Sequence, residues 1–145
     1  MDSAHYKKLK TMYLGANVNT KIFDTTTYKI EAEKATIKLA VSEDYFHALS
    51  AIHGTVYFKM LDNAAYFAVS SIIKGCFMLT SSFNINILRP VSKGMLTAIG
   101  TVRYKSSNLF AADAKLYNQD GKEVAFGTGN FARSKILLSE EVVYK

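Results

Sequence analysis

An acidic residue in an apolar stretch is the strongest chemical signal in this sequence. Asp62 lies in the segment 55–74, whose only other charged residues are Lys59 and the terminal Lys74. A carboxylate among apolar neighbours can activate a water molecule or attack a carbonyl carbon. The alternative is structural, because Asp62 follows Lys59 by three residues and the two could form an ion pair on a helix surface. The sequence leaves both interpretations open.

A His-Gly pair, His53-Gly54, comes directly before the same segment. The helix is expected to begin near Gly54, and the first N–H groups of a helix have no partner within it. They point at an anion or a polarised carbonyl oxygen, and the helix dipole strengthens this attraction. A glycine lets a substrate oxygen approach the backbone closely, so this is an oxyanion hole in outline. Alternatively, Gly54 forms only a tight turn, and His53 is expected to bond the backbone and shape the loop.

Together these residues resemble the thioesterase superfamily of the hot-dog fold, in the branch that includes phenylacetyl-CoA-type thioesterases. The family pattern is a polar residue, then a His-Gly pair six positions later, then a helix that carries an acid. Its counterparts in this chain are His47, His53, Gly54 and Asp62. The segment 82–90, SFNINILRP, is similar to the family's central strand, which ends in a proline. The resemblance covers about residues 34–133, but Thr55 stands where many members have a second glycine, which affects the expected loop geometry.

The resemblance implies an α+β hot-dog fold, a curved antiparallel sheet wrapped around a long central helix. One domain would span residues 1–145, with a helical extension at 1–16. The implied reaction is hydrolysis of an acyl-CoA thioester to free acid and coenzyme A, in a homo-oligomer that is a dimer or a dimer of dimers. The active site would lie between subunits, with Gly54 and His47 from one chain and Asp62 and Thr80 from its partner.

Several other residues are expected to assist catalysis or bind the substrate. Thr80 is at the strand position where related enzymes carry a hydroxyl, which would hold the attacking water; an ordinary strand threonine is the alternative. Strand periodicity places Thr80 on one face with Ser82, Asn84 and Asn86. His47 either donates a hydrogen bond to the carbonyl or the water, or lies on the surface. The substrate-binding candidates are His53, Asn63, Arg89, Lys93, Arg103 and Lys105; for the basic ones a solvated surface is the alternative.

The elements that must position these residues follow from hydrophobic periodicity. Residues 4–14 are predicted to form an amphipathic helix, 34–41 a strand, and 55–74 a buried helix that ends before Gly75. Strands are expected at 77–88, 95–105, 109–117 and 123–133, with a hairpin turn at the sequence NQDG. A run of strands after a buried helix indicates an α+β fold with an antiparallel sheet.

Composition narrows the class of protein. The chain has 145 residues, a length typical of one domain, and its single cysteine, Cys76, excludes an intrachain disulfide and is expected to be an apolar filler. No apolar signal-peptide core or membrane span is apparent, so a cytoplasmic protein without a membrane partner is expected. The net charge of +6 favours anionic partners, and because the basic residues are dispersed, coenzyme A is favoured over nucleic acid. No metal or cofactor is expected, since no ligand spacing for a metal appears.

Two other functions on the same fold remain open. A hot-dog hydratase or dehydratase needs a histidine and an acid, which His47 and Asp62 could supply, but the proline-rich loop typical of that branch is missing. A non-catalytic acyl-CoA-binding protein is the second alternative, and residues 1–16 are too short for an appended DNA-binding region. Turnover that leaves the thioester intact would favour the first, and tight binding without thiol release the second.

Overall fold

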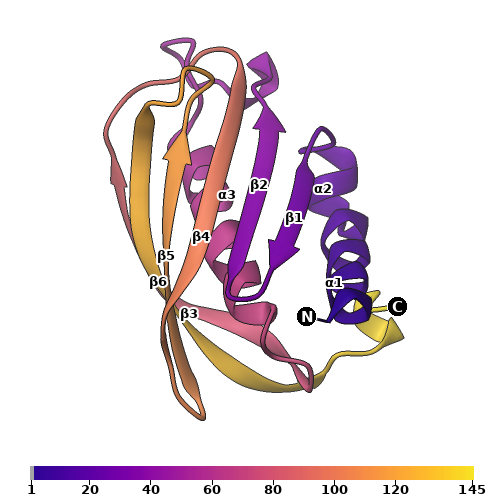
Figure 1. Cartoon of the computed structure of the whole chain (residues 1–145). Coiled ribbons are helices and arrows are strands. Elements are labelled where there is room, and N and C mark those ends of the chain that lie inside the picture. Colours follow the sequence, from indigo (N-terminus) through magenta and orange to yellow (C-terminus); the bar gives the residue numbers. More distant parts are fainter. Residues whose placement is uncertain (1) are drawn as a thin grey trace.

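The computed structural model describes residues 2–145 as a six-stranded antiparallel sheet curved around one long helix (Figure 1). The helices are α1 (Ser3–Gly15), α2 (Asn17–Lys21) and α3 (Gly54–Ser70), with short 3-10 turns η1 (Glu43–Tyr45) and η2 (Glu140–Val142). The strands are β1 (Thr27–Glu31), β2 (Lys34–Ala40), β3 (Cys76–Ile87), β4 (Met95–Lys105), β5 (Leu109–Tyr117) and β6 (Glu123–Leu137). Their order in the sheet is β1-β2-β4-β5-β6-β3. The predicted α+β architecture is confirmed.

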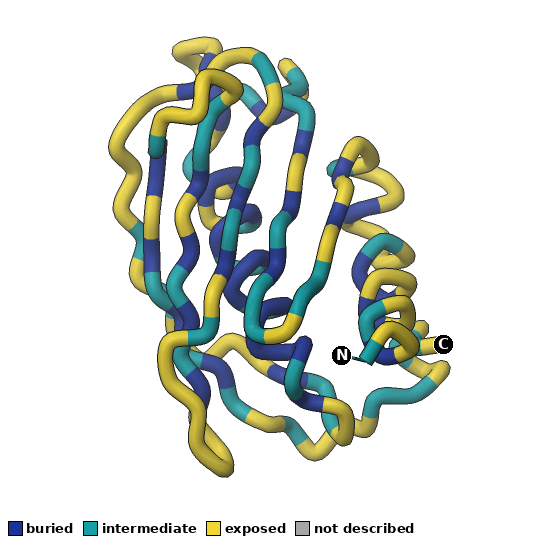
Figure 2. The backbone as a smooth tube through the Cα atoms, in the orientation of Figure 1, coloured by how far each residue is buried: buried dark blue, intermediate teal, exposed yellow. Residues whose placement is uncertain are grey.

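The core lies between α3 and the concave face of the sheet, where Figure 2 shows buried backbone on both. From α3, Met60, Leu61 and Ala64 are fully buried. The facing strands alternate as expected, and their inward residues include Ala35, Ile37, Leu39, Leu96, Ala98, Ala112, Ala114 and Leu116. At Gly100 the helix approaches β4 so closely that a Cβ would lie 2.2 Å from the carbonyl oxygen of Ala64. Small residues therefore let the sheet wrap tightly around α3.

Two predicted boundaries are wrong. The central helix ends at Ser70 rather than at 74, because the Ser71 hydroxyl donates to the Ala68 carbonyl (2.6 Å) and accepts from the Glu33 N–H (2.8 Å). Gly75 therefore does not cap the helix. The last strand continues to Leu137, four residues beyond the predicted end at 133. None of the helices among residues 2–145 has the length and hydropathy needed to cross a bilayer.

The prediction that Thr80 shares one face of its strand with Ser82, Asn84 and Asn86 is wrong, because β3 contains a bulge. The pairing of β3 with β6 shifts register between Thr80 and Ser82, so one extra residue interrupts the alternation. Thr80 contacts α3, whereas Ser82 accepts a hydrogen bond from Asn130 on the opposite face of the sheet. Phe83 turns toward α3 instead, with its ring 5.7 Å from that of Phe58. The polar series after the bulge, Ser82, Asn84 and Asn86, is therefore on the other face from Thr80.

The two edge strands of the sheet differ in character. β1 has five residues, carries Lys29 and Glu31, and lies beside α1 and α2 (Figure 1). β3 has twelve residues, CFMLTSSFNINI, with no charge and no proline, and its only neighbour among the described strands is β6. Long uncharged edges are templates for pairing with another chain, and proteins normally block them with charges or proline. The free edge of β3 is therefore suited to pairing with a second strand.

Candidate functional site

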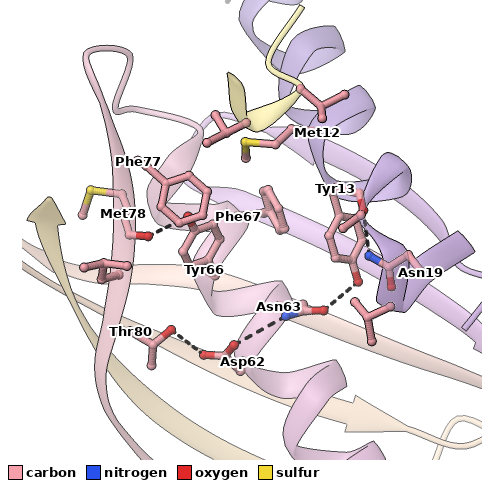
Figure 3. Close-up of a pocket in the computed structure, with 15 residues that line it drawn as sticks. Met12, Tyr13, Asn19, Asp62, Asn63, Tyr66, Phe67, Phe77, Met78 and Thr80 are labelled. Atoms are coloured by element: carbon pink, nitrogen blue, oxygen red, sulfur yellow. Dashed lines mark hydrogen bonds between the residues drawn. The ribbon is translucent and has the colours of Figure 1, made fainter. Parts of the chain in front are cut away.

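Asp62 projects from α3 toward β3, where two side chains hold its carboxylate (Figure 3). The Thr80 hydroxyl donates to its Oδ1 (2.9 Å), and the Asn63 amide donates to its Oδ2 (3.4 Å). Within residues 2–145, no Lys or Arg nitrogen lies within 4.0 Å of this carboxylate. The ion pair with Lys59, which was the structural alternative for Asp62, does not form.

Lys59 points away from Asp62 into an aromatic and amide environment. Its Nζ donates to Asn63 Oδ1 (2.9 Å) and to the Tyr13 hydroxyl (3.2 Å). It also lies over the rings of Phe23 and Tyr13, 4.7 and 5.1 Å from their centroids. Burial lowers the pKa of Lys59 to about 8, against a weaker opposing effect of the Asp62 charge.

The surroundings of Asp62 raise the pKa of its carboxyl group relative to that of an exposed aspartate. Burial raises the pKa of the Asp62 carboxyl above its usual value, while the hydrogen bonds from Thr80 and Asn63 and the charge of Lys59 act in the opposite direction. Burial also raises the pKa values of the nearby Tyr13 and Tyr66, so both phenols stay protonated at neutral pH. Asp62 is thus a stronger base than an exposed aspartate.

A cavity of about 570 Å³ opens beside this carboxylate (Figure 3). Segments far apart in the sequence form its walls: α1, α2, α3, β3 and the C-terminal turn η2. Its lining is mostly apolar and includes Met12, Tyr13, Val18, Tyr66, Phe67, Phe77, Met78, Leu79, Val142 and Val143, with Asn19, Asp62, Asn63 and Thr80 as polar members. This volume is in the range of small-molecule sites. The N-terminal helix, predicted only as amphipathic, forms a wall of the site, and its Leu9 and Tyr13 are buried.

Gly54 is the first residue of α3, and its N–H is a free donor. His53 caps the helix, since its Nδ1 accepts from the Thr55 N–H (3.1 Å), and its carbonyl accepts from the Val56 N–H (2.9 Å). The Gly54 N–H has no hydrogen-bond acceptor within residues 2–145. The prediction that His53 bonds the backbone is confirmed.

His47 lies in the exposed loop that leads to α3. Its Nδ1 accepts from the Leu49 N–H (3.1 Å), and its backbone bonds close a turn with Ala51 and Ser50. Ser50 has a φ of 59°, so the loop turns sharply at this point. An accepting Nδ1 leaves the Nε2–H of the neutral ring available as a donor.

The donor and the carboxylate are well separated within one chain. Gly54 and Asp62 are eight residues apart on one helix, which corresponds to roughly 12 Å at a rise of about 1.5 Å per residue. A Cβ on Gly54 would lie 3.7 Å from Ile87 at the end of β3, whereas Asp62 contacts Thr80 near its middle. One substrate carbonyl group cannot contact both groups of the same chain.

The predicted basic residues occupy two ends of the sheet. Arg103 pairs with Asp113 (2.9 Å) and Lys105 with Glu33 (3.0 Å), toward the end of β4. Arg89 is exposed in the loop after β3, and its carbonyl accepts from the Tyr57 hydroxyl (2.7 Å) in the first turns of α3. Lys93 follows in the same loop, and neither residue has a carboxylate within 4.0 Å in the part of the chain that the structure describes. Within that part, no cluster of three metal-ligating side chains occurs.

Comparisons with known proteins agree with the fold. The sequence matches the profile of the thioesterase superfamily over residues 49–125, just over half of the chain. The fold is similar to the PaaI protein of the Escherichia coli phenylacetic acid degradation operon, with a TM-score of 0.82 and 22% identity over 94% of this chain and 97% of that one. A thioesterase mutant from Pseudomonas aeruginosa has a TM-score of 0.75 and 18% identity, covering 88% and 94% of the two chains. A thioesterase mutant from Staphylococcus aureus has a TM-score of 0.72 and 18% identity over 79% and 95%. No curated protein is a significant match in sequence.

Proposed function

Since the chain belongs to the thioesterase superfamily and has the hot-dog fold, we propose that it hydrolyses acyl-CoA thioesters to a free acid and coenzyme A. One observation carries this proposal. Asp62 is a half-buried carboxylate without an ion pair within residues 2–145, and it faces an apolar cavity from a helix whose first N–H is free. Such a carboxylate costs stability, so its presence in α3 supports a chemical role rather than a structural one.

The proposed site is shared between two copies of the chain paired through β3. Two-fold pairing of β3 with its copy would continue the sheet and satisfy the free edge. Both α3 helices would then lie side by side on the same face of the joint sheet and run antiparallel. This arrangement brings Gly54 of one subunit toward Asp62 of the other, which resolves the separation of the two groups within one chain. His47 would accompany Gly54, and Thr80 would accompany Asp62.

In the proposed reaction, the thioester carbonyl oxygen accepts a hydrogen bond from the Gly54 N–H, which stabilises the negative charge that develops on that oxygen. Asp62 either takes a proton from the water that attacks the carbonyl carbon or attacks that carbon itself. Thr80 donates its only hydroxyl proton to Asp62, so its oxygen can still accept a hydrogen bond from the water. When the C–S bond breaks, coenzyme A leaves as the thiolate and takes up the proton that Asp62 removed from the water. After direct attack, a water molecule hydrolyses the Asp62–acyl anhydride, which releases the free acid, restores the carboxylate and supplies the proton to the thiolate.

The surroundings of Asp62 suit the two parts of this substrate. The apolar cavity next to Asp62 and Thr80 would hold the acyl group. Arg89 and Lys93 are favoured as phosphate-binding residues because they lie at the Gly54 end of α3 without acidic partners within residues 2–145, whereas Arg103 and Lys105 are already paired. Arg and Lys bind phosphates by charge-assisted hydrogen bonds.

A thiol-release assay over a panel of acyl-CoA substrates, run with the wild type and Asp62→Asn, tests the proposed function. Asparagine keeps the shape but cannot accept a proton or act as a carboxylate nucleophile, so turnover should fall roughly a hundred- to ten-thousand-fold. Circular dichroism and light scattering should show an unchanged fold and oligomer. If the Asn variant keeps more than about a tenth of the wild-type rate, well short of that expected loss, Asp62 is not the catalytic group.

Isotope labelling separates the two roles open to Asp62. Direct attack forms an anhydride between Asp62 and the acyl group. When water opens this anhydride at the Asp62 carbon in a single turnover in ¹⁸O-water, the heavy oxygen stays in the Asp62 carboxylate and the product acid carries an oxygen from the protein, so label in the Asp62 peptide identifies direct attack. Activation of water would place the heavy oxygen in the product acid. Mass spectrometry of the peptide and of the product reads both outcomes.

A further inference from the structure

The side-chain amide of Asn63 lies between the N-terminal helix and the Asp62 carboxylate (Figure 3). Its Oδ1 accepts from the Tyr13 hydroxyl of α1 (2.8 Å) and from Lys59 Nζ (2.9 Å). Its Nδ2 faces Asp62 Oδ2 at 3.4 Å. Because Lys59 Nζ also donates to the Tyr13 hydroxyl, the hydroxyl proton is directed to Asn63.

This arrangement favours one orientation of the amide. If the amide were reversed, its NH₂ group would meet the Lys59 ammonium, its oxygen would face the Asp62 carboxylate, and the Tyr13 hydroxyl proton would lose its acceptor. The contacts with Lys59 and Asp62 would then be donor to donor and acceptor to acceptor. Tyr13 and Lys59 therefore keep the NH₂ group of Asn63 directed at Asp62.

Each oxygen of the Asp62 carboxylate consequently has one donor from a different element. Thr80 of β3 holds Oδ1, and Asn63 of α3 holds Oδ2, with Tyr13 of α1 behind Asn63. Two donors on opposite oxygens limit rotation of the carboxylate plane. A reacting carboxylate gains rate when its lone pairs are held toward the attacked atom, and small misplacements are costly.

We propose that Asn63 is a positioning residue for the Asp62 carboxylate and that Tyr13 of the N-terminal helix acts through Asn63. This proposal rests on the proposed thioesterase function, with Asp62 as the reacting group. It makes α1 part of the active-site architecture as well as a wall of the cavity. Binding of the acyl group does not require this contact, so its loss is expected to lower kcat and to leave KM nearly unchanged.

A double-mutant cycle on the full-length protein tests the proposal. Asn63→Ala should lower kcat by about tenfold or more with KM changed by less than about twofold. Tyr13→Phe keeps the ring and removes one donor, so kcat should fall less, because Lys59 still donates to Asn63. In the Asn63→Ala background, Tyr13→Phe should cause no further loss of kcat, since Tyr13 would have nothing left to act through.

Tyr28→Phe is the matched control. The Tyr28 ring lies 5.1 Å from the Tyr13 ring, and its buried hydroxyl has no hydrogen-bond partner within residues 2–145. Its loss should leave kcat unchanged. If Asn63→Ala proves unstable, comparing kcat of Tyr13→Phe with that of Tyr28→Phe still decides the question, because both variants keep their rings.

The outcomes separate failure of this inference from failure of the proposed function. Full kcat in Asn63→Ala, or independent losses from Tyr13 and Asn63, would overturn the positioning role while Asp62→Asn stayed inactive. An active Asp62→Asn variant would instead remove the proposed function itself. A kcat loss in Tyr28→Phe as large as that in Tyr13→Phe would show that only the packing of the aromatic cluster matters.

Discussion

At the residue scale, one helix carries two groups with complementary electrostatics. The Gly54 N–H, which has no acceptor within residues 2–145, can stabilise negative charge at one end of α3. Two turns further along the helix, the Asp62 carboxylate itself carries negative charge when it is ionised. Both residues are half-buried, and this partial burial reduces solvent screening and strengthens their electrostatic effects. The proposed chemistry depends on a backbone donor and on a side chain, and different substitutions are needed to test each.

Gly54→Pro removes the proposed oxyanion donor without breaking the helix. Proline is tolerated at the first helical position, and His53, at φ −65° and ψ 150°, already has the extended conformation favoured before proline. Loss of one such donor should lower kcat roughly 10²- to 10³-fold. Gly54→Ala is the control, because it keeps the N–H and its Cβ would meet only Ile87 at an ordinary 3.7 Å. Equal rate losses in a thiol-release assay of the two variants would argue against the donor role.

The raised pKa of Asp62 predicts how activity and stability change with pH. Because the ionised form reacts, kcat/KM should fall as pH falls through a pKa above the ordinary 3.8. Because burial disfavours ionised Asp62 in the folded state, the wild type loses stability as pH rises through this pKa. Asp62→Asn should therefore melt at a higher temperature than the wild type at pH 7, by scanning calorimetry, and lose this advantage below about pH 3.8, the ordinary aspartate value. A less stable Asn variant at neutral pH would contradict this reasoning.

At the element scale, α1 does more than extend the domain. Its apolar face buries Leu9, Met12 and Tyr13 against the hot-dog core, and Met12 and Tyr13 also line the cavity beside Asp62. The C-terminal turn η2 closes the same cavity with Val142 and Val143. The N-terminal helix α1 and the C-terminal turn thus lie close together (Figure 1) and bound the space proposed for the acyl group.

Met12→Trp should restrict the protein to shorter acyl groups than the wild type accepts. The larger side chain would occupy part of the cavity of about 570 Å³ beside Asp62. For long-chain and aromatic acyl-CoA substrates, kcat/KM should fall about tenfold or more, whereas hydrolysis of acetyl-CoA should change little. Lys10→Trp, on the exposed face of the same helix, is the control. Equal losses for short and long acyl groups would place the acyl group elsewhere.

At the scale of the whole molecule, the free β3 edge and the spacing on α3 lead to the same conclusion. One edge of β3, a strand of twelve uncharged residues without proline, has no partner strand within residues 2–145. The two proposed reactive groups of one chain are also too far apart to act together. Pairing two subunits through β3 would remove both problems. We therefore propose that the enzyme acts as at least a dimer.

Complementation between two inactive variants tests the shared site. In a dimer of one Gly54→Pro chain and one Asp62→Asn chain, one site would combine both defects and the other would be fully wild type. Tandem affinity purification of this mixed dimer should therefore give about half of the wild-type activity, although each parent variant is inactive. An inactive mixed dimer would show that Gly54 and Asp62 act within one chain, and a monomer with full activity would have the same consequence.

Hydrophobic periodicity made the central helix and five of the six strands predictable. Four of these strands, β2, β4, β5 and β6, bury a regular set of apolar residues. β1 has only Tyr28 fully buried in its five residues, so it left no such pattern and was not predicted. The candidate carboxylate and the His-Gly pair were also visible in the sequence, since their chemistry depends on residue type and spacing along one helix.

Only the tertiary structure decided which partners these residues have. Lys59 could have paired with Asp62 by sequence spacing, but Tyr13 and Asn63 attract it instead, and Tyr13 comes from an element fifty residues away in the chain. The bulge in β3 directs Thr80 to Asp62 and turns Ser82 away, although strand periodicity treats them alike. The alternation of side chains along a strand or helix follows from the local backbone. Contacts between elements depend instead on how the sheet bends around the helix, and this bend is determined only by the packing of the whole core.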